Sequence, residues 1–224
     1  MRLAMFGVTG TCGGPLLTTA LDRGHEVRAL ARAPEKVGPT NSRLTVVAAD
    51  ALDADAVART VAGADAVVST LGGFRGPESL SHGTHNILEA MQGHGVRRLV
   101  VVQGVHLSMS GDPGNLGLRM ISAVMGIVGR DIVGHGHTMA AELLNNGLDW
   151  TLVRIPRVRG TAATGNHRLG TLRVGPWSHV TSGDVVSAAL RLAGCSEWVR
   201  QAPMLASGRP IGTASTGPLT APDG

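Results

Sequence analysis

Aromatic side chains are scarce in this sequence, which contains two phenylalanines, three tryptophans and no tyrosine. Proteins that recognise single-stranded nucleic acid commonly stack bases on aromatic rings, and nucleic-acid-binding proteins gather positive charge into patches. Here the formal net charge is +4, but the positive residues are scattered along the chain. We therefore expect small anionic molecules as partners, and no nucleic acid.

Cysteine is rare as well, with Cys12 and Cys195 far apart in the chain. Two separated thiols make no disulfide framework, which favours a reducing compartment. Long apolar runs are also missing, because the most apolar helical stretch, residues 120–128, is short and is interrupted by Gly126. A strand-like segment already starts at Leu3, so we expect no signal peptide. These features predict a cytoplasmic protein without a membrane partner.

Short apolar segments alternate with helical patterns along most of the chain. The strand-like segments are residues 3–6, 26–30, 44–48, 66–69, 99–102 and 150–153. Helical patterns cover residues 15–22, 54–61 and 79–92, and one long helix is expected within 118–145. Asp53 is suited to cap the second of these helices, and Gly63 to end it. The alternation predicts an α/β fold with a doubly wound parallel sheet of the Rossmann type.

The length and composition fit one globular domain, since 43% of the 224 residues are hydrophobic and 16% are charged. We assign this domain to residues 1–205, of which 155–205 form a small substrate-side region. That region contains candidate strands at 171–174 and 199–205, and Ser182-Gly183-Asp184 is expected to cap a helix at 185–192. Residues 206–224 lack apolar periodicity and are expected to form a flexible tail.

The segment Gly7-Val8-Thr9-Gly10-Thr11-Cys12-Gly13 lies between the first strand and the first helix. Gly7 allows a sharp turn, Gly10 removes the Cβ that would block a pyrophosphate, and Gly13 lets the helix pack close to the strand. Free N–H groups at the helix start would hold the anion, and Thr9 and Thr11 add hydroxyl groups beside it. The spacing is G-x-x-G-x-x-G, and a purely structural turn is the alternative. Cys12 is either a reactive thiol at a helix start or a small residue tolerated beside the phosphate.

Basic residues follow the second strand, at the point that faces the adenosine ribose in this architecture. Proteins specific for NAD commonly place a carboxylate there, whereas this chain has Arg32, with Lys36 close behind. Both cations are suited to bind the 2′-phosphate of NADP. The alternative is a solvated basic turn.

Residues at the ends of the next two strands complete the predicted cofactor site. Asp50 is placed to accept a hydrogen bond from the adenine amino group, with a backbone contact from Ala51, or it simply starts the next helix. Leu71 and Gly72 form a bend that lets the cofactor approach. Arg75 either reaches a phosphate or faces water.

A family resemblance rests on six segments that follow one another: GVTGTCGGPL, ALARAPEK, VVAADALD, ADAVVSTLGG, HNILEAMQGHGVRRLVVV and NNGLDWTLVRIPRV. The chain resembles the atypical short-chain dehydrogenase/reductases of the NAD(P)H-binding, NmrA-like family, and its layout is most similar to the flavin reductase/biliverdin reductase B branch. The resemblance implies a Rossmann fold that binds NADP(H). It also implies cofactor contacts at Gly7, Thr9, Gly10, Thr11, Gly13, Arg32, Asp50, Ala51, Leu71, Gly72 and Arg75.

The catalytic residues of the wider superfamily are missing. Its typical members use Tyr-x-x-x-Lys, but this chain has no tyrosine and its one lysine is Lys36. At the end of the fifth strand, where relatives often have a Ser/Thr pair, the chain has Gln103-Gly104. Gln103 is a candidate for binding the cofactor carboxamide or a substrate carbonyl, or it is a polar residue satisfied at a strand end.

Histidines are the remaining candidates for proton transfer. His106 has suitable chemistry, although a lone histidine more often caps or packs. His137 is preferred over His135 for its position, with solvent-facing histidines as the alternative. His135 and His137, two residues apart, diverge on a helix, and His82 and His85 lack a third ligand, so we expect no metal site.

These observations predict an NADPH-dependent reductase of a small flavin-, quinone- or tetrapyrrole-like acceptor, acting as a monomer or homodimer. Such acceptors take their proton from water, so no tyrosine is needed. Met109, Leu118, Met120 and Met125 are candidates for an apolar acceptor pocket, as is Pro156, with Arg154 and Arg157 available to anionic groups. The alternative is an NmrA-like protein that binds NADP(H) and signals redox state without turnover. A sugar-nucleotide epimerase is a weaker third possibility.

Overall fold

The computed structural model describes residues 1–38, 40–72, 76–109, 112 and 116–207. Its main sheet has the strand order β3-β2-β1-β4-β5-β6-β10-β8, in which β8 pairs antiparallel with β10 and the other neighbours are parallel. The strands are β1 (Arg2–Phe6), β2 (Glu26–Ala31), β3 (Leu44–Ala48), β4 (Ala66–Ser69), β5 (Arg98–Gly104), β6 (Asp149–Ile155), β8 (His167–Gly170) and β10 (Met204–Ser207). This is the predicted Rossmann-type α/β fold.

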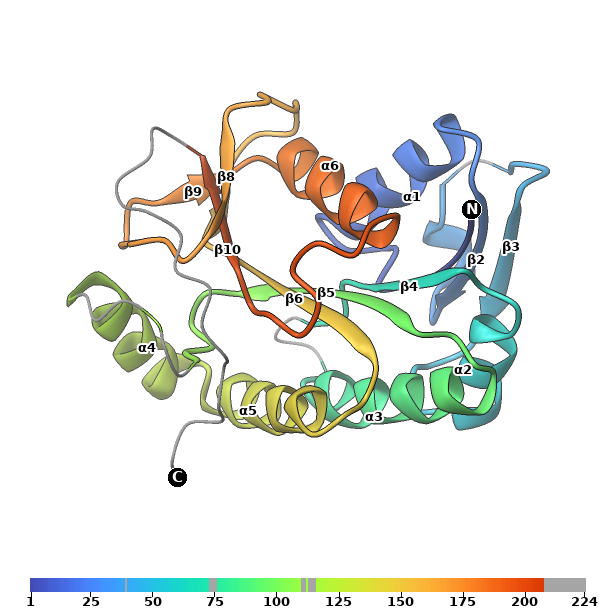
Figure 1. Cartoon of the computed structure of the whole chain (residues 1–224), viewed down its shortest axis with the longest axis horizontal. Helices are drawn as coiled ribbons and strands as arrows, with labels where there is room; N and C mark the ends of the chain where they lie inside the picture. The colour runs from blue at the N-terminus through green and yellow to red at the C-terminus, as the bar shows by residue number, and fades with distance from the viewer. Residues whose placement is uncertain (39, 73–75, 110–111, 113–115, 208–224) are drawn as a thin grey trace.

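Helices cover both faces of the sheet (Figure 1). One face carries α1 (Gly13–Asp22) and α6 (Ser182–Ala193), and the other carries α2 (Ala54–Val61), α3 (Glu78–Gly93) and α5 (Arg130–Leu144). Each face has its own core, because strand residues alternate between the two apolar clusters. Leu3 and Met5 belong to the cluster with α1 and α6, whereas Ala4 and Phe6 belong to the other.

Three predictions about helix ends can be compared with the structure. The Asp53 carboxylate accepts a hydrogen bond from the Ala56 N–H and caps α2, as predicted. Gly63, with φ of +72°, follows the end of this helix. The cap of α6 is Thr181 rather than the Ser182-Gly183-Asp184 segment, because the Thr181 hydroxyl accepts from the Asp184 N–H.

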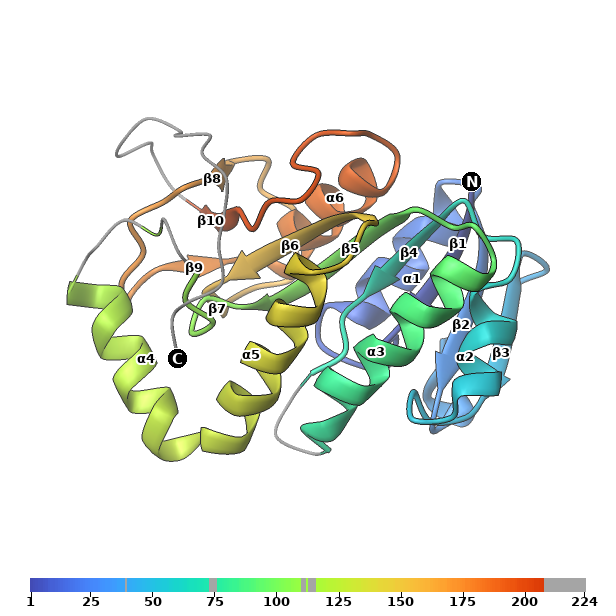
Figure 2. The same cartoon turned by 60° about the horizontal axis from the view of Figure 1, so that its bottom comes forward.

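The prediction of one long helix within 118–145 is wrong. The chain forms two helices, α4 (Leu116–Val128) and α5, which are separated at Gly129 and lie at an angle to each other (Figure 2). Gly129 has non-helical backbone angles and starts α5. Helix α4 therefore projects beyond the carboxyl end of the sheet instead of lying along it.

The substrate-side region differs most from expectation. The strand expected at 171–174 lies earlier, as β8, and Leu172 and Val174 instead fill a small separate apolar cluster. The final strand begins at Met204, not at 199, and continues through Ala206 and Ser207, which were expected to belong to the tail. Residues 208–224 lie outside the described part of the chain. A short parallel pair, β7 (Arg157–Val158) and β9 (His179–Val180), was not predicted.

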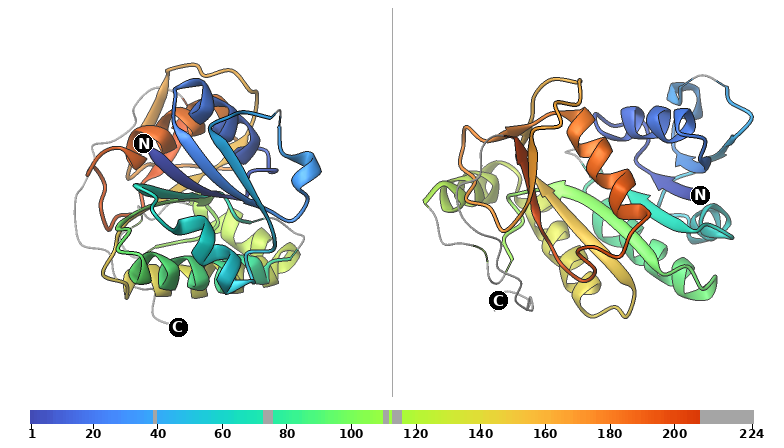
Figure 3. Two further views of the ribbon diagram at one scale, coloured as in Figure 1. Left: turned by 90° about the vertical axis from the view of Figure 1, so that its right-hand side faces the viewer. Right: turned by 45° about the horizontal axis from the view of Figure 1, so that its top comes forward.

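Within the described residues, no helix combines the length and the apolar character needed to cross a bilayer. Figure 3 shows α6 beside α1 over one face of the sheet, so a late segment of the chain completes a core that begins with the first strand.

Candidate cofactor and acceptor site

The glycine loop is shaped by contacts that leave no space for side chains. Gly7 has φ of +77°, and a Cβ added to it would lie 2.6 Å from the Thr70 carbonyl. A Cβ on Gly13 would lie 2.0 Å from the Gly7 carbonyl oxygen, so α1 packs directly against the loop. The Thr70 hydroxyl donates to the carbonyl oxygens of Phe6 and Gly7, at 3.1 Å each, and fixes the turn from the neighbouring strand.

The beginning of α1 presents backbone donors that the described part of the chain leaves unused. The cap residue, Cys12, makes no side-chain hydrogen bond to the helix. The loop is closed by two backbone bonds of 3.0 Å, from Gly10 N–H to the Gly7 carbonyl and from Gly14 N–H to the Gly10 carbonyl. The backbone N–H groups of residues 11–13 lie between these two bonds. Together with the positive end of the helix dipole, they are suited to hold a pyrophosphate.

A narrow cleft of about 120 Å³ lies at the carboxyl ends of β1, β2, β3 and β4. Adjacent parallel strands bring together residues that are far apart in the sequence, which is the usual place for a nucleotide in this architecture. Of the predicted cofactor residues, eight line this cleft: Gly7, Thr9, Gly10, Arg32, Asp50, Ala51, Leu71 and Gly72.

Arg32 and Asp50 face each other across the cleft, with 3.6 Å between a guanidinium nitrogen and a carboxylate oxygen. More than half of the Arg32 side chain is exposed, so its guanidinium remains accessible to a second anion. Asp50 also accepts a hydrogen bond from the Leu52 N–H, which places its carboxylate at the start of the turn. Both interpretations of Asp50, as a cleft residue and as a turn former, are therefore compatible with its position.

Two amide side chains fix the backbone of the cleft. The Asn86 amide donates to the Ala51 carbonyl at 2.9 Å, and the Gln103 amide donates to the Leu71 carbonyl at 2.6 Å. Gln103 is buried, and it couples the end of β5 to the bend after β4. One of its donors is therefore already used by the protein.

The remaining predicted cofactor residues lie elsewhere. Lys36 is exposed on η1 (Pro34–Lys36) and does not line the cleft. Thr11 and Cys12 form the turn into α1, and burial raises the pKa of the Cys12 thiol, which speaks against a reactive thiolate. Arg75 lies outside the described residues.

A second, larger cavity of about 500 Å³ lies beside the ends of β5 and β6. Its lining is mainly apolar and contains the predicted residues Met120, Met125, Pro156 and Arg157. Met109 is instead buried in the apolar cluster on the face that carries α2, α3 and α5, and the side chain of Leu118 lies outside the part of the chain that the structure describes. Val124, Ile155 and Pro176 complete most of its apolar surface.

His106 lines the larger cavity, and its ring lies against Gly104 at the end of β5. Burial lowers the pKa of His106, and electrostatic repulsion from His137 lowers it further. At neutral pH His106 is therefore uncharged and offers a neutral imidazole to the cavity. His137, the other histidine predicted for proton transfer, is not among the described residues that line this cavity.

Arg154 is not available to substrates, contrary to our expectation. Its side chain is buried and pairs with Asp112 through two contacts of 2.6 Å. It also donates to the carbonyls of Leu107 and Ala202, so it joins β6 to the segments on either side. This role is structural.

Three histidines of α3 and α5 have local partners. A ring nitrogen of His135 lies 2.7 Å from the Ser81 hydroxyl, and its ring meets His82 edge-on. His85 faces Glu142 at 3.7 Å. Among the residues that the structure describes, no three His, Cys, Asp or Glu side chains come together in a possible metal site.

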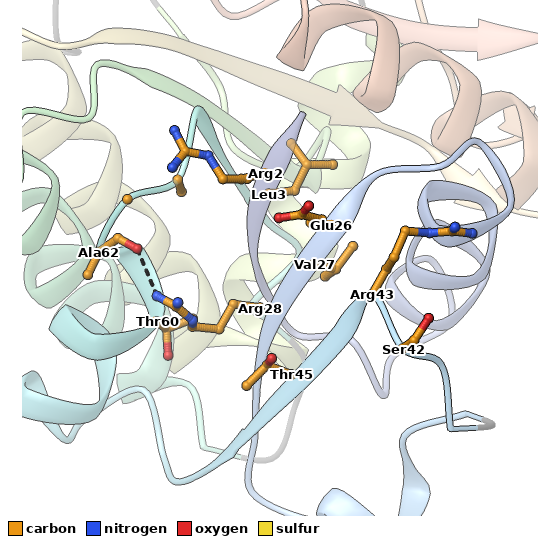
Figure 4. Close-up of a pocket in the computed structure, with 12 residues that line it drawn as sticks. Arg2, Leu3, Glu26, Val27, Arg28, Ser42, Arg43, Thr45, Thr60 and Ala62 are labelled. Atoms are coloured by element: carbon orange, nitrogen blue, oxygen red, sulfur yellow. Dashed lines mark hydrogen bonds between the residues drawn. The ribbon is translucent and has the colours of Figure 1, made fainter.

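The amino-terminal edge of the sheet contains a third cavity, of about 370 Å³ (Figure 4). Arg28 donates to the carbonyls of Arg59 and Ala62 at 2.7 Å, and so binds the end of α2. Arg2 pairs with Asp65. Both guanidinium groups thus serve the fold at this edge.

Sequence reasoning missed several residues that shape the cleft. Gly76 and Ser79 line it, Thr70 fixes the glycine loop, and Asn86 holds Ala51. Thr70 directly follows a predicted strand, so its position at a strand end could have indicated that it belongs to the cleft. Asn86 lies within a helix, and no local pattern indicates its contact with a loop 35 residues away.

The chain belongs to the NAD(P)H-binding family, whose model matches residues 7–193. A 3-beta-hydroxysteroid dehydrogenase from Mycolicibacterium neoaurum is 34% identical over 124 residues, which cover 49% of this chain and 34% of that protein. The match therefore spans about a third of the length of this curated relative.

Solved structures show the same fold over nearly the whole chain. A short-chain dehydrogenase/reductase from Veillonella parvula, solved in complex with NADP, has a TM-score of 0.77 at 17% identity and covers 93% of this chain and 94% of its own. An anaerobillin reductase from Escherichia coli O157:H7 has a TM-score of 0.71 at 20% identity, with coverage of 95% and 100%. At these identities the likeness concerns the fold alone.

Proposed function

We propose that this protein is an NADPH-dependent oxidoreductase that reduces a flavin-, quinone- or tetrapyrrole-like acceptor. The observation that carries the proposal is the adjacency of two spaces at the carboxyl edge of the sheet. Gln103 is bonded to the wall of the glycine-lined cleft, and the next residue, Gly104, lines the apolar cavity. This arrangement is suited to an extended cofactor whose reactive end reaches an apolar acceptor.

Bound NADPH would supply a hydride, and the acceptor would take its proton from water or from the protein. The loop N–H groups bind the pyrophosphate, and Arg32 binds the 2′-phosphate. Gln103 orients the bend at Leu71 and Gly72, while the neutral imidazole of His106 would offer its ring N–H to the acceptor cavity. Without tyrosine, the chain depends on an acceptor that is easily protonated.

The first test measures NADPH consumption by the purified protein with flavins, quinones and biliverdin, while cofactor binding is followed separately. Turnover with one of these acceptors supports the proposal. Tight NADPH binding without turnover supports the alternative, a non-catalytic NADP(H)-dependent redox sensor. That alternative is favoured by the missing Tyr-x-x-x-Lys pair.

Preference for NADPH over NADH rests on Arg32 and is tested by Arg32→Glu. We expect NADPH to bind at least about tenfold more weakly, because a carboxylate repels the 2′-phosphate, while NADH affinity changes little. The matched control is Lys36→Glu, which makes the same charge change outside the cleft. Equal losses for both cofactors, or equal effects of the two variants, would overturn the assignment.

The cellular setting is part of the same proposal. We place the protein in the cytoplasm, where the free thiols of Cys12 and Cys195 are kept reduced. It would act there as a monomer or homodimer on a small-molecule acceptor, without nucleic-acid partners.

A further inference from the structure

Helix α4 exposes an apolar stripe to solvent. The exposed fractions are 52% for Met120, 57% for Val124, 84% for Ile127 and 70% for Val128. Successive residues in this set are four, three and one positions apart, which places all of them on one side of the helix. The whole helix contains one charged residue, Arg119. Exposed apolar surface that is contiguous on a soluble domain commonly marks a binding site.

The stripe is continuous with the acceptor cavity. Met120 and Val124 line that cavity, whereas Ile127 and Val128 extend the same stripe about one helical turn beyond it. On the other side of the opening, Pro176 lines the cavity, and its neighbour Trp177 is 86% exposed. The cavity lining joins Met120 and Val124 of α4 to Arg157 of β7 and to Ser178, which directly precedes β9.

The charges of the cavity restrict what fits. Among the residues described as lining it, Arg157 carries a permanent charge, and His106 is the one other titratable group. A phosphorylated flavin would bring two negative charges into a largely apolar space. A neutral ring with an aliphatic chain matches both the cavity and the narrow stripe that leads away from it.

We propose that the acceptor is a quinone with a long aliphatic tail, whose ring occupies the cavity while its tail lies along α4 over Ile127 and Val128. This inference rests on the proposed function and narrows its acceptor class. The reaction would consume one NADPH and one proton from water, and would release the hydroquinone and NADP⁺. The tail raises affinity by covering the stripe, and it takes no part in hydride transfer.

The experiment compares two quinones that share one ring, 2,3-dimethoxy-5-methylbenzoquinone and its 6-decyl derivative. For the wild-type protein we expect a KM at least about tenfold lower for the decyl compound, since each buried methylene favours binding. Ile127→Ser should raise that KM about threefold or more. It should leave KM and kcat for the tailless quinone unchanged, because Ile127 does not line the cavity.

Leu52→Ser is the matched control, because Leu52 is another exposed apolar residue and lies directly before the cap of α2. It should affect neither quinone. Equal KM values for the two quinones in the wild-type protein, or an equal effect of Ile127→Ser on both, would overturn the inference.

Direct binding without NADPH separates this inference from the proposed function. If neither quinone is reduced but the decyl compound binds more tightly and loses this advantage in Ile127→Ser, the reductase proposal fails and the tail site stands. If size-exclusion chromatography shows a dimer that Ile127→Ser dissociates while the tail preference is unchanged, a second copy covers the stripe and the inference is overturned.

Discussion

The two edges of the main sheet use their polar groups in opposite ways. At the amino edge, the Arg28 guanidinium donates to two carbonyls at the end of α2, and the Arg2 guanidinium pairs with Asp65. At the carboxyl edge, glycine removes side chains, and the backbone N–H groups at the start of α1 are left for a ligand. The arginines that line the cavity at the amino edge are therefore structural, whereas the nearly bare backbone at the carboxyl edge is the surface that we propose as the cofactor site.

The largest effect should come from Gly13→Ala, which places a Cβ 2.0 Å from the Gly7 carbonyl oxygen. Overpacking at this point must move the loop, and we expect NADPH affinity to fall about 100-fold. Gly14→Ala is the control, since its Cβ would meet the nearest atom, the Val8 carbonyl oxygen, at an ordinary 3.6 Å. Isothermal titration with NADPH, after circular dichroism has verified folding, measures the difference. Similar affinities for the two variants would show that close helix packing does not shape the site.

The next effect concerns Asp184, a buried carboxylate that anchors the loop before β8. Burial raises its pKa, but hydrogen bonds with Thr164, Thr181 and Gly165 outweigh burial and lower the pKa to about 2. Because the folded pKa is below the unfolded value, the carboxylate stabilises the fold fully above about pH 4. We expect roughly 2 kcal/mol of this stability to be lost as the pH falls from about 4 to about 2.

Urea unfolding of the wild type and of Asp184→Asn at several pH values measures this contribution. The difference between the two proteins should shrink across that pH range. A difference that stays constant with pH would assign the stability to packing instead of charge.

The smallest effect should be that of Arg28→Met at the amino edge. Losing two hydrogen bonds to the end of α2 should lower the unfolding free energy by about 1–2 kcal/mol, and NADPH affinity should not change. Arg59→Met removes an exposed charge from the same helix turn and serves as the control. Thermal unfolding measures the loss of stability, and NADPH titration measures cofactor binding. Weaker NADPH binding by Arg28→Met would contradict the conclusion that the amino edge contributes to stability alone.

The sequence predicted what depends on local periodicity. The segments 44–48, 54–61 and 66–69 were placed at their observed bounds, because buried parallel strands and a capped helix have short-range signals. Eight predicted cofactor residues meet in one cleft, since strand ends converge in this fold. The break at Gly129 was missed because the apolar pattern continues through it.

Contacts between segments that are far apart in the sequence could not be predicted from local sequence patterns. The ion pair between Arg154 and Asp112 joins residues 42 positions apart, and it turns an expected substrate residue into a structural one. The position of β8 depends on pairing with β10, which comes more than thirty residues later. Leu172 and Val174 alternate as residues of a strand do, but their side chains lie in a separate small apolar cluster.

The late position of α6 and β10 has a consequence for synthesis on the ribosome. All three helices of the face covered by α2, α3 and α5 have emerged once residue 144 is outside the ribosome, whereas α6, which covers the opposite face, ends only at residue 193. Nascent chains therefore lack the contacts of α6 with β4 and β5 for much of translation, and apolar residues on this face, such as Val100, stay without their late covering helix. We expect chains stalled before Ser182 to be captured by chaperones, and chains that include Ala193 to escape them.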